Sequence, residues 1–243
     1  AGGAIARWHI DAIDHVGGRV VAAVEPRELP PARMKALRGA EIMKNTADLE
    51  SFMEWQREFG EPVGNVVICT PNDVHAEHID LALRSSAHAI CEEPIALMRA
   101  EVDSLLALER ASDHRVLPIL QLREHSALRS LHDRVINRPC RSSVDVDYCA
   151  TWDVPEHRWR ADDSRSGGLV FELGIHTLDA MIWIFGELRA FRVLRRDSHE
   201  VDAQLDLERA RVRWRITAHE RGAVDGSCLR RDIVVDGERI DLM

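Results

Sequence analysis

Two short stretches of the sequence carry the residue types that proton transfer needs. In the first, residues 167–186 (GGLVFELGIHTLDAMIWIFG), Glu172 and His176 stand four positions apart, and Asp179 and Trp183 continue the helical spacing. Residues three or four positions apart share one face of a helix. A histidine can act as a general base near neutral pH, and a carboxylate one turn away can orient it. The same spacing fits a packed helix with a hydrogen-bonded histidine, so both interpretations stay open.

The second stretch is HAICEEPIAL, residues 88–97, in which an apolar run meets two adjacent acids and a proline, Glu92-Glu93-Pro94. An apolar strand that ends in paired carboxylates is typical of the floor of a site. A glutamate in an apolar setting beside a second carboxylate has a raised pKa, because both burial and like charge oppose ionisation. Acid chemistry at this turn is therefore one interpretation of the pair.

A third pattern, at the N-terminus, is typical of a dinucleotide site. Gly3, Ala4 and Ile5 open a predicted helix, and Glu25 ends the next predicted strand, 22 residues after Gly3. Glycine lets the backbone approach a pyrophosphate, and a helix N-terminus favours anions. An acid about 20 residues further on can bind a ribose 2′-hydroxyl, and Glu25 favours NAD over NADP because it would repel a 2′-phosphate. Only the tail of the glycine fingerprint is present, so an ordinary helix start remains the alternative.

A fourth group of polar residues follows the predicted strand at residues 65–70. Ligands of open α/β sheets bind at the carboxyl ends of the strands. The candidate cofactor contacts at this end are Thr70, Pro71, Asn72 and His75. His75 and His78 also have the i,i+3 spacing of metal ligands, but the sequence supplies no third ligand beside them, so no metal site is predicted.

The elements that must position these residues change character at about residue 122. Before it, short apolar runs alternate with amphipathic stretches, which predicts a Rossmann-type α/β domain with a doubly wound parallel sheet over residues 1–121. The predicted strands are residues 19–25, 65–70, 88–92 and 116–121. The predicted helices are residues 4–16, 47–58, 74–84 and 99–112. Thr46 or Asp48 is the predicted N-cap of the second helix.

Residues 122–243 are predicted to form an α+β domain with an open, mainly antiparallel sheet. Its predicted helices are residues 126–137 and 174–185. Its predicted strands are residues 142–151, 188–195, 201–208, 211–217 and 229–235. Strict alternation in RARVRWRIT, residues 209–217, places Ala210 and Trp214 on one face and Arg211 and Arg213 on the other. This arginine row is either a solvated face or a contact with a ligand or a second subunit.

Composition limits the classes of function. With 243 residues, 45% of them hydrophobic, the chain can bury a core, and a net charge of −9 argues against a nucleic-acid partner. No apolar run approaches the roughly 20 residues of a membrane span, and the N-terminus does not resemble a signal peptide. Five scattered cysteines without a CxxC pair predict a cytoplasmic protein with reduced thiols. The chain begins in a glycine turn and ends within a strand pattern, so we expect a fragment that lacks its first strand and its C-terminal end.

Taken together, ICTPNDVHAEHIDLAL, HAICEEPIAL and the GG…ELGIHTLD segment resemble the Gfo/Idh/MocA oxidoreductases over essentially the whole chain. Within that family, ILQLREHSALRSLHDRV and HRWRADDSRSGG are most similar to the WlbA/WbpB-type enzymes. The resemblance implies NAD-dependent oxidation of a sugar hydroxyl. In the WlbA/WbpB type this is the 3-hydroxyl of UDP-N-acetyl-glucosaminuronic acid, during synthesis of surface polysaccharide such as lipopolysaccharide.

The resemblance also implies roles for individual residues. It makes His176 the base and Glu172, where the family usually has Asp or Asn, the group that holds it. It makes Gln121, Glu92 and Glu93 cofactor contacts. The residues that it places along the sugar or uronate pocket are Arg123, Trp159, Arg160 and Asp179. A homodimer or homotetramer is the oligomeric state that the family favours.

One position departs from the family pattern. Members usually read Glu-Lys-Pro where this chain reads Glu92-Glu93-Pro94, and the family lysine polarises the reacting hydroxyl. Glu93 reverses that charge, and the only lysines of the chain are Lys35 and Lys44. The sequence therefore predicts weak or absent dehydrogenase activity. Three alternatives stay open, namely an active enzyme that uses Glu93 differently on another polyol or sugar, an inactive nucleotide- or sugar-binding sensor or scaffold, and a single-codon error.

Overall fold

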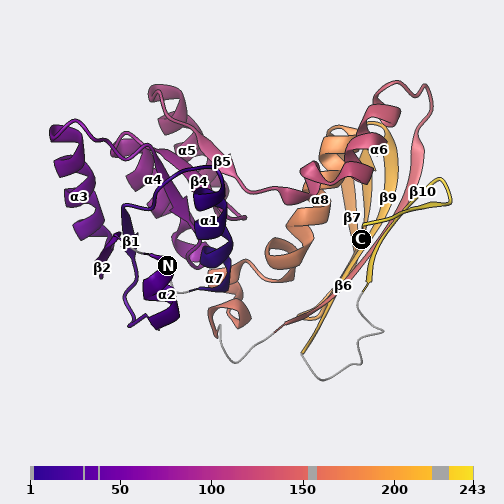
Figure 1. The fold of residues 1–243 in the computed structure, drawn as a ribbon. Coiled ribbons are helices and arrows are strands. Elements are labelled where there is room, and N and C mark those ends of the chain that lie inside the picture. The colour runs from indigo at the N-terminus through magenta and orange to yellow at the C-terminus, as the bar shows by residue number, and fades with distance from the viewer. Residues whose placement is uncertain (1–2, 30, 38, 153–157, 221–229, 243) are drawn as a thin grey trace. The chain divides into compact units, whose positions relative to one another are not determined.

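The computed structural model describes residues 3–29, 31–37, 39–152, 158–220 and 230–242. The chain divides into two compact units, Ala1–Ile119 and Leu120–Met243, and each is described by itself. The ribbon in Figure 1 labels their helices and strands.

The first unit alternates helices with short parallel strands, as the sequence predicts. Its helices are α1 (Ala4–His15), α2 (Pro31–Ala36), α3 (Thr46–Glu58), α4 (His75–Arg84) and α5 (Arg99–Ala111). Its strands are β1 (Ala22–Val24), β2 (Glu41–Met43), β3 (Asn65–Ile68), β4 (His88–Cys91) and β5 (Val116–Pro118). A 3-10 turn, Asn72–Val74, precedes α4. The Rossmann-type parallel arrangement is thereby confirmed.

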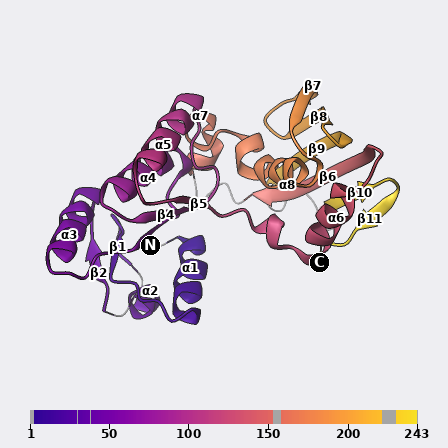
Figure 2. The same ribbon diagram turned by 90° about the horizontal axis from the view of Figure 1, so that it is seen from above.

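The parallel strands form two ladders in the described residues, not the single doubly wound sheet that we predicted. β1 pairs with β2, and β4 lies between β3 and β5. The core of the larger ladder is a cluster in which Ile68 and Cys91 on the strands meet Ile79, Leu83 and Leu105 on the helices. Figures 1 and 2 both show α4 and α5 side by side next to β4.

Three details of this unit differ from the sequence prediction. Helix α2 and strand β2 were not predicted, and the strands predicted at 19–25 and 116–121 are each only three residues long. The N-cap of α3 is Asn45, not Thr46 or Asp48, and its side chain accepts a hydrogen bond from the Asp48 backbone N–H. The short strands leave the candidate site residues on the turns that follow them.

The second unit packs two helices on one face of a six-stranded sheet. Its helices are α6 (Ser126–Ile136), α7 (Asp163–Ser166) and α8 (Ile175–Phe185), with 3-10 turns at Gln121–Glu124 and Arg158–Ala161 and a π-helical turn at Val170–Gly174. The strands are β6 (Ser142–Trp152), β7 (Leu188–Arg196), β8 (Glu200–Leu207), β9 (Ala210–Glu220), β10 (Arg230–Val235) and β11 (Glu238–Ile240). The strand order is β11-β10-β6-β9-β8-β7. Among the described strands of this sheet only β6 and β9 pair in parallel, so the mainly antiparallel prediction is confirmed.

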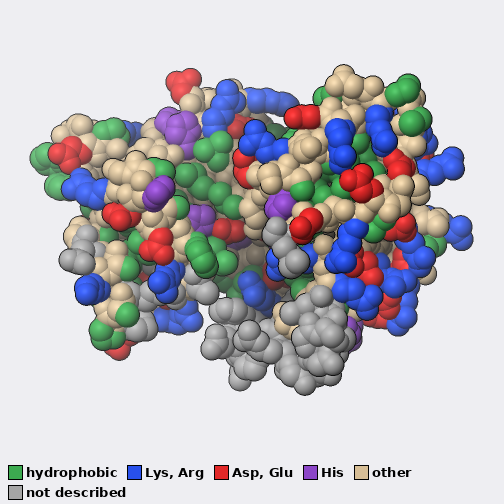
Figure 3. All heavy atoms as spheres, turned by 45° about the vertical axis from the view of Figure 1, so that its right-hand side comes forward, with side chains coloured by type: hydrophobic (Ala, Val, Ile, Leu, Met, Phe, Trp, Pro, Cys, Tyr) green, Lys and Arg blue, Asp and Glu red, His purple; other side chains and the backbone are tan. Residues whose placement is uncertain are grey.

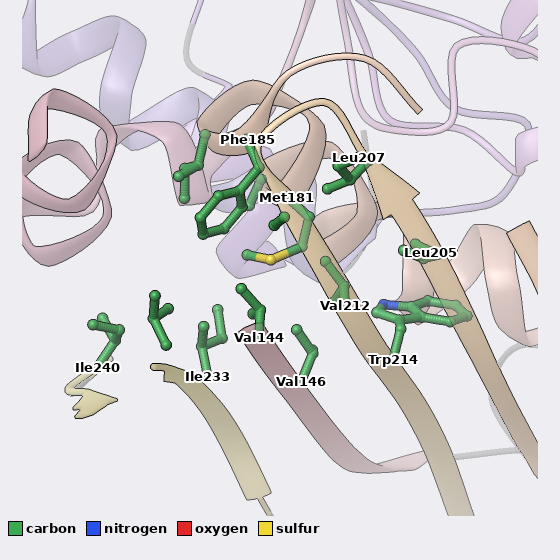
Figure 4. Close-up of a cluster of buried hydrophobic side chains, with 14 of the residues drawn as sticks. Val144, Val146, Met181, Phe185, Leu205, Leu207, Val212, Trp214, Ile233 and Ile240 are labelled. Atoms are coloured by element: carbon green, nitrogen blue, oxygen red, sulfur yellow. The ribbon is translucent and has the colours of Figure 1, made fainter. Parts of the chain in front are cut away.

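The core of the second unit lies between the helices and one sheet face. Figure 4 shows Met181 and Phe185 of α8 above Val144, Val212 and Trp214 of the sheet. The alternation predicted for residues 209–217 is present, since the even-numbered side chains from 210 to 216 are at most 2% exposed. The arginines therefore point to the sheet face on which none of the described helices packs.

One helical run, 163–185, is long and apolar enough to cross a membrane, although the sequence analysis found no such segment. Its apolar side chains pack into the core of the second unit. Ala180, Met181, Ile184 and Phe185 are at most 1% exposed, because they face the sheet. The run is the core helix of this unit.

The cysteines in the described residues hold free thiols. Cys91 and Cys149 are buried, Cys69 is half-buried and Cys140 is exposed, whereas Cys228 lies outside the described residues. Burial raises the pKa of the Cys69 thiol. Burial and the charges of Glu92 and Glu93 raise that of Cys91 even further, so both thiols stay protonated.

Candidate functional site

In the first unit, the acid pair after β4 is connected to the first helix. The Oε1 atom of Glu92 lies 2.6 Å from Nε2 of His9 on α1, and both side chains are at most 20% exposed. A close contact of this kind fixes the carboxylate relative to the start of the chain. Glu93 follows at an X-Pro bond that is cis. The contact of His9 was not predicted, because its partner is 83 residues away in sequence.

His75 lies beneath two of the turns that carry candidate cofactor contacts. Its Nδ1 atom is 2.7 Å from the Pro94 carbonyl oxygen and its Nε2 atom is 2.8 Å from the Thr70 carbonyl oxygen. The residue is only 1% exposed. Both ring nitrogens therefore contact the backbone, and the ring connects the turn after β3 to the turn after β4.

His75 and His78, which have the i,i+3 spacing of metal ligands, both make contacts within the protein. His78 lies 3.1 Å from the Thr70 hydroxyl through Nδ1, and burial lowers its pKa. No group of three or more His, Cys, Asp or Glu side chains in the described part of the chain could hold a metal ion. Asn72, in the 3-10 turn between them, is buried.

Glu25 lies directly after β1, as a ribose-binding acid would. Its side chain accepts hydrogen bonds at Oε1 from Nε of Arg27 at 3.1 Å and from the Arg27 backbone N–H at 3.3 Å. The Nζ of Lys44 donates to the Arg27 carbonyl oxygen at 3.1 Å. Glu25 is 4% exposed, and the contacts with Arg27 hold its carboxylate in one orientation.

The start of α1 leaves room for a ligand. Gly3 is the N-cap, and a Cβ atom placed on it would meet nothing within 4 Å in the described structure. Ile5 in the first turn is 42% exposed, and the side chain of Ala4 lies outside the described residues. An open helix N-terminus and an oriented acid at the end of the next strand fit the chemistry of a dinucleotide.

In the second unit, Glu172 belongs to the π-helical turn that precedes α8. Such turns are frequent at functional sites. The Glu172 side chain is 9% exposed and its Oε2 atom lies 3.1 Å from Nε of Arg160. The Arg160 guanidinium also lies over the Trp159 ring, 5.4 Å from its centroid. Three of the predicted site residues thus form one cluster.

Close packing fixes the position of the helix that carries His176. The indole N–H of Trp214 donates to the Thr177 hydroxyl at 2.8 Å, and that hydroxyl donates to the Gly174 carbonyl oxygen at 3.1 Å. A Cβ atom on Gly174 would lie 2.7 Å from the Trp214 ring, so only glycine lets the ring approach this closely. The residues on either side of His176 are therefore held against the sheet.

His176 lines a cavity of about 250 Å³ within the second unit. The polar side chains that share this cavity include Gln121, Tyr148, Thr177 and Arg231. Gln121 and His176 were predicted as site residues and are here brought together. Tyr148 and Arg231 were not predicted, and the signal that could have found them is the pairing of β6 with β10, which places them directly opposite each other.

The remaining predicted substrate contacts pair with each other. Arg123 donates to Asp179 through Nε at 2.8 Å and through a terminal nitrogen at 2.5 Å. The hydrogen bonds that Arg123 donates to Asp179 raise the pKa of Arg123. Asp179 is 17% exposed and Arg123 is 40% exposed, so the carboxylate orients the guanidinium.

Comparison with known proteins agrees with this architecture. The model described as "Oxidoreductase family, NAD-binding Rossmann fold" matches residues 2–119, and the model of its C-terminal alpha/beta domain matches residues 136–217. The chain belongs to the Gfo/Idh/MocA oxidoreductase family. Its first unit is the NAD-binding Rossmann domain of that family, and its second unit is the α/β domain.

Two solved structures of one family member cover almost the whole chain. The WlbA (WbpB) dehydrogenase from Thermus thermophilus, solved with NAD and alpha-ketoglutarate, is 32% identical with a TM-score of 0.91, over 100% of this chain and 80% of that one. The same dehydrogenase in complex with NAD and UDP-GlcNAcA matches with the same identity and TM-score over 98% of this chain and 80% of that one.

A functionally named relative in the family is more distant. The 1,5-anhydro-D-fructose reductase of Ensifer adhaerens is 26% identical over 188 residues, which are 74% of this chain and 53% of that protein. The chain spans about half the length of this relative and of the scyllo-inositol 2-dehydrogenase of Bacillus subtilis, which it also matches.

Proposed function

We propose that this chain is the nucleotide-binding and catalytic part of an NAD-dependent dehydrogenase that oxidises a sugar hydroxyl, with a UDP-N-acetyl-hexosaminuronate as the substrate. The observation that carries the proposal is the likeness over the full chain to a dehydrogenase solved with NAD and UDP-GlcNAcA. Synthesis of surface polysaccharide in the cytoplasm is the process in which such an enzyme would act.

Residues of the first unit, together with Gln121 of the second, hold the cofactor in this proposal. Gly3, Ala4 and Ile5 contact the pyrophosphate through the helix N-terminus, and Glu25 accepts a hydrogen bond from a ribose hydroxyl. The turn of Thr70, Pro71 and Asn72, the acid pair and Gln121 complete the set, while His75 keeps two of the turns in place. Bound NAD supplies the acceptor for the hydride that leaves the sugar carbon.

Residues of the second unit move the proton and hold the sugar. His176 accepts the hydroxyl proton at a ring nitrogen as general base, which typically contributes about 10²–10⁴-fold in rate. Glu172 acts by position, since its ion pair with Arg160 stabilises the π-helical turn directly before His176. Trp159 and Arg160 line the sugar, and the Arg123–Asp179 pair presents an oriented guanidinium to it.

Glu93 limits the rate in this proposal. Where relatives place a cation near the developing alkoxide, this chain has a carboxylate, and loss of such stabilisation costs about 2.7–4 kcal/mol. We expect Glu93→Lys to raise kcat for NADH formation from NAD and UDP-GlcNAcA by at least tenfold, measured by NADH absorbance. Glu93→Gln, which removes the charge only, should give a smaller gain.

One control completes this experiment. Glu93→Lys combined with His176→Ala should return to background, because the base is gone. A rate for Glu93→Lys no higher than that of the unchanged protein would contradict the role given to Glu93. The second candidate function is an inactive nucleotide- or sugar-binding protein, which the charge of Glu93 favours. Binding of NADH without turnover, in both the unchanged chain and Glu93→Lys, would support it.

A further inference from the structure

Among the arginines near the proposed sugar site, Arg231 is distinguished by its lack of a carboxylate partner. Arg123 is hydrogen-bonded to Asp179, and Arg160 is paired with Glu172. For Arg231, which lines the cavity of His176, the described residues offer no carboxylate within ion-pair distance. Its charge is therefore not neutralised within the described part of the chain.

Tyr148 holds the Arg231 guanidinium at the wall of the cavity. The two residues are paired across the antiparallel β10–β6 ladder, and the centre of the guanidinium lies over the ring, 5.7 Å from its centroid. A guanidinium on an aromatic face is stabilised by the π electrons and keeps its N–H edge available. The stacking thus fixes a planar cation whose donors are not used by the ring.

The other charged group of the cavity wall does not cancel this cation. Asp232 also lines the cavity, but its carboxylate is paired with Arg239. Gln121 and Thr177 contribute neutral polar groups. The cavity therefore combines one oriented cation with the imidazole of His176, which is suited to an anionic ligand that also carries a hydroxyl.

We propose that Arg231, stacked on Tyr148, forms a carboxylate-binding subsite that takes the acid group of a sugar acid. A planar carboxylate can accept two parallel hydrogen bonds from the guanidinium edge. A cavity of about 250 Å³ is below the usual 300–1,000 Å³ of ligand pockets. It therefore fits one sugar ring and its acid group, not a whole nucleotide sugar. The inference rests on the proposed function at one point, which is that the bound sugar acid is the substrate of the enzyme.

The test compares acidic and neutral ligands in direct binding. Glucuronate and glucose, and UDP-GlcNAcA and UDP-GlcNAc, are titrated into the unchanged chain and into Arg231→Gln by calorimetry. We expect Arg231→Gln to lower the affinity for glucuronate and for UDP-GlcNAcA by about 10–100-fold, because hydrogen bonds to charged groups are lost. The affinities for glucose and for UDP-GlcNAc should change less than twofold.

Three further variants make the result specific. Arg230→Gln is the matched control, because Arg230 is the preceding residue of the strand, lies on the opposite sheet face and pairs with Asp147 at 3.5 Å. It should leave all four affinities unchanged. Arg231→Lys keeps the charge but not the planar edge, so its affinities for the two acidic ligands should lie between those of the unchanged chain and of Arg231→Gln. Tyr148→Leu should weaken the binding of the acidic ligands only. Equal effects of the 230 and 231 substitutions would overturn the proposal.

The outcomes also separate this inference from the proposed function. If UDP-GlcNAc and UDP-GlcNAcA weaken equally in Arg231→Gln, the guanidinium serves the diphosphate and the carboxylate subsite is wrong. If glucuronate binding depends on Arg231 but no NADH is formed by the unchanged chain or by Glu93→Lys, the subsite stands and the dehydrogenase does not. If NADH is formed and Arg231→Gln leaves KM for UDP-GlcNAcA unchanged, the dehydrogenase function stands and the carboxylate subsite is wrong.

Discussion

At the scale of single residues, the buried acid after β1 gives the sharpest cofactor prediction. Glu25 accepts a hydrogen bond from Arg27, and Lys44 donates to the Arg27 carbonyl oxygen, so the chain has cations that could bind a 2′-phosphate once the acid is removed. Glu25→Ala removes the acceptor for the ribose hydroxyl and the group that repels a phosphate. We expect NADH to bind about 10–100-fold more weakly, since a hydrogen bond to a charged group is lost, and NADPH to bind more tightly. Fluorescence titration with each reduced cofactor measures both.

Glu25→Gln is the matched control for this prediction. It keeps the shape of the side chain and an acceptor oxygen but removes the charge, so it should lose less affinity for NADH than Glu25→Ala. Arg27→Gln in the Glu25→Ala background should abolish the gain for NADPH. An unchanged ratio of NADH to NADPH affinity in Glu25→Ala would contradict the role of this acid in cofactor choice.

Local spacing and resemblance each contributed part of the candidate site. Spacing singled out His176 and Glu172, and the resemblance added Gln121, which lines the same cavity as His176. His9, Tyr148 and Arg231 were not, because their contacts join residues far apart in sequence, such as the 83 positions between His9 and Glu92. Local patterns carry no information on such pairs. The sequence also could not indicate that Arg123 and Asp179 bind each other, because each alone fits a substrate contact.

At the scale of elements, segments with a clear apolar pattern were predicted and some short ones were not. Helices α3 to α6 and strands β6 to β9 follow such patterns, whereas α2 and β2 have at most six residues each, too few for a period to show. The predicted N-cap of α3 was wrong because Asn45, Thr46 and Asp48 are all of residue types that are common at this position. Only the extended backbone of Asn45, φ −149° and ψ 170°, decides among them.

The packing of α8 against β9 gives a prediction for this element. Gly174→Ala places a methyl group 2.7 Å from the Trp214 ring, and overpacking of this kind costs about 1–3 kcal/mol. We expect a lower free energy of unfolding for the second unit, measured by urea titration with tryptophan fluorescence. The displaced α8 should also lower kcat, because His176 is two residues away.

Gly64→Ala is the control for this prediction, since a Cβ atom at Gly64 meets nothing within 4 Å in the described structure. It should change the unfolding midpoint little. If Gly174→Ala has the same free energy of unfolding as the unchanged chain, the Trp214 ring moves aside freely. This contact would then not fix the position of α8.

At the scale of the whole molecule, the helix-free face of the second unit's sheet suits a second copy of this chain. Acidic and basic rows alternate there, with Asp202 of β8 3.2 Å from Arg213 and 3.6 Å from Arg215 of β9. Figure 3 shows acidic and basic side chains intermixed on the part of the surface formed by this unit. A shallow groove of about 510 Å³ between β6 and β7 is lined by the same strands.

Alternating rows of opposite charge are self-complementary about a twofold axis, because each row can face its counterpart on an identical surface. We therefore propose a homodimer or homotetramer that buries this face. Arg213→Glu puts a like charge beside Asp202 and should shift the assembly toward monomer, with the dissociation constant raised at least tenfold. Arg99→Glu on α5, where the arginine is 88% exposed and pairs with Asp103, is the matched charge reversal away from the sheet and should leave the assembly unchanged. The measurement is the molar mass by light scattering over a concentration series. If the unchanged chain is a monomer, or if the two variants have equal molar masses, this face is not the interface.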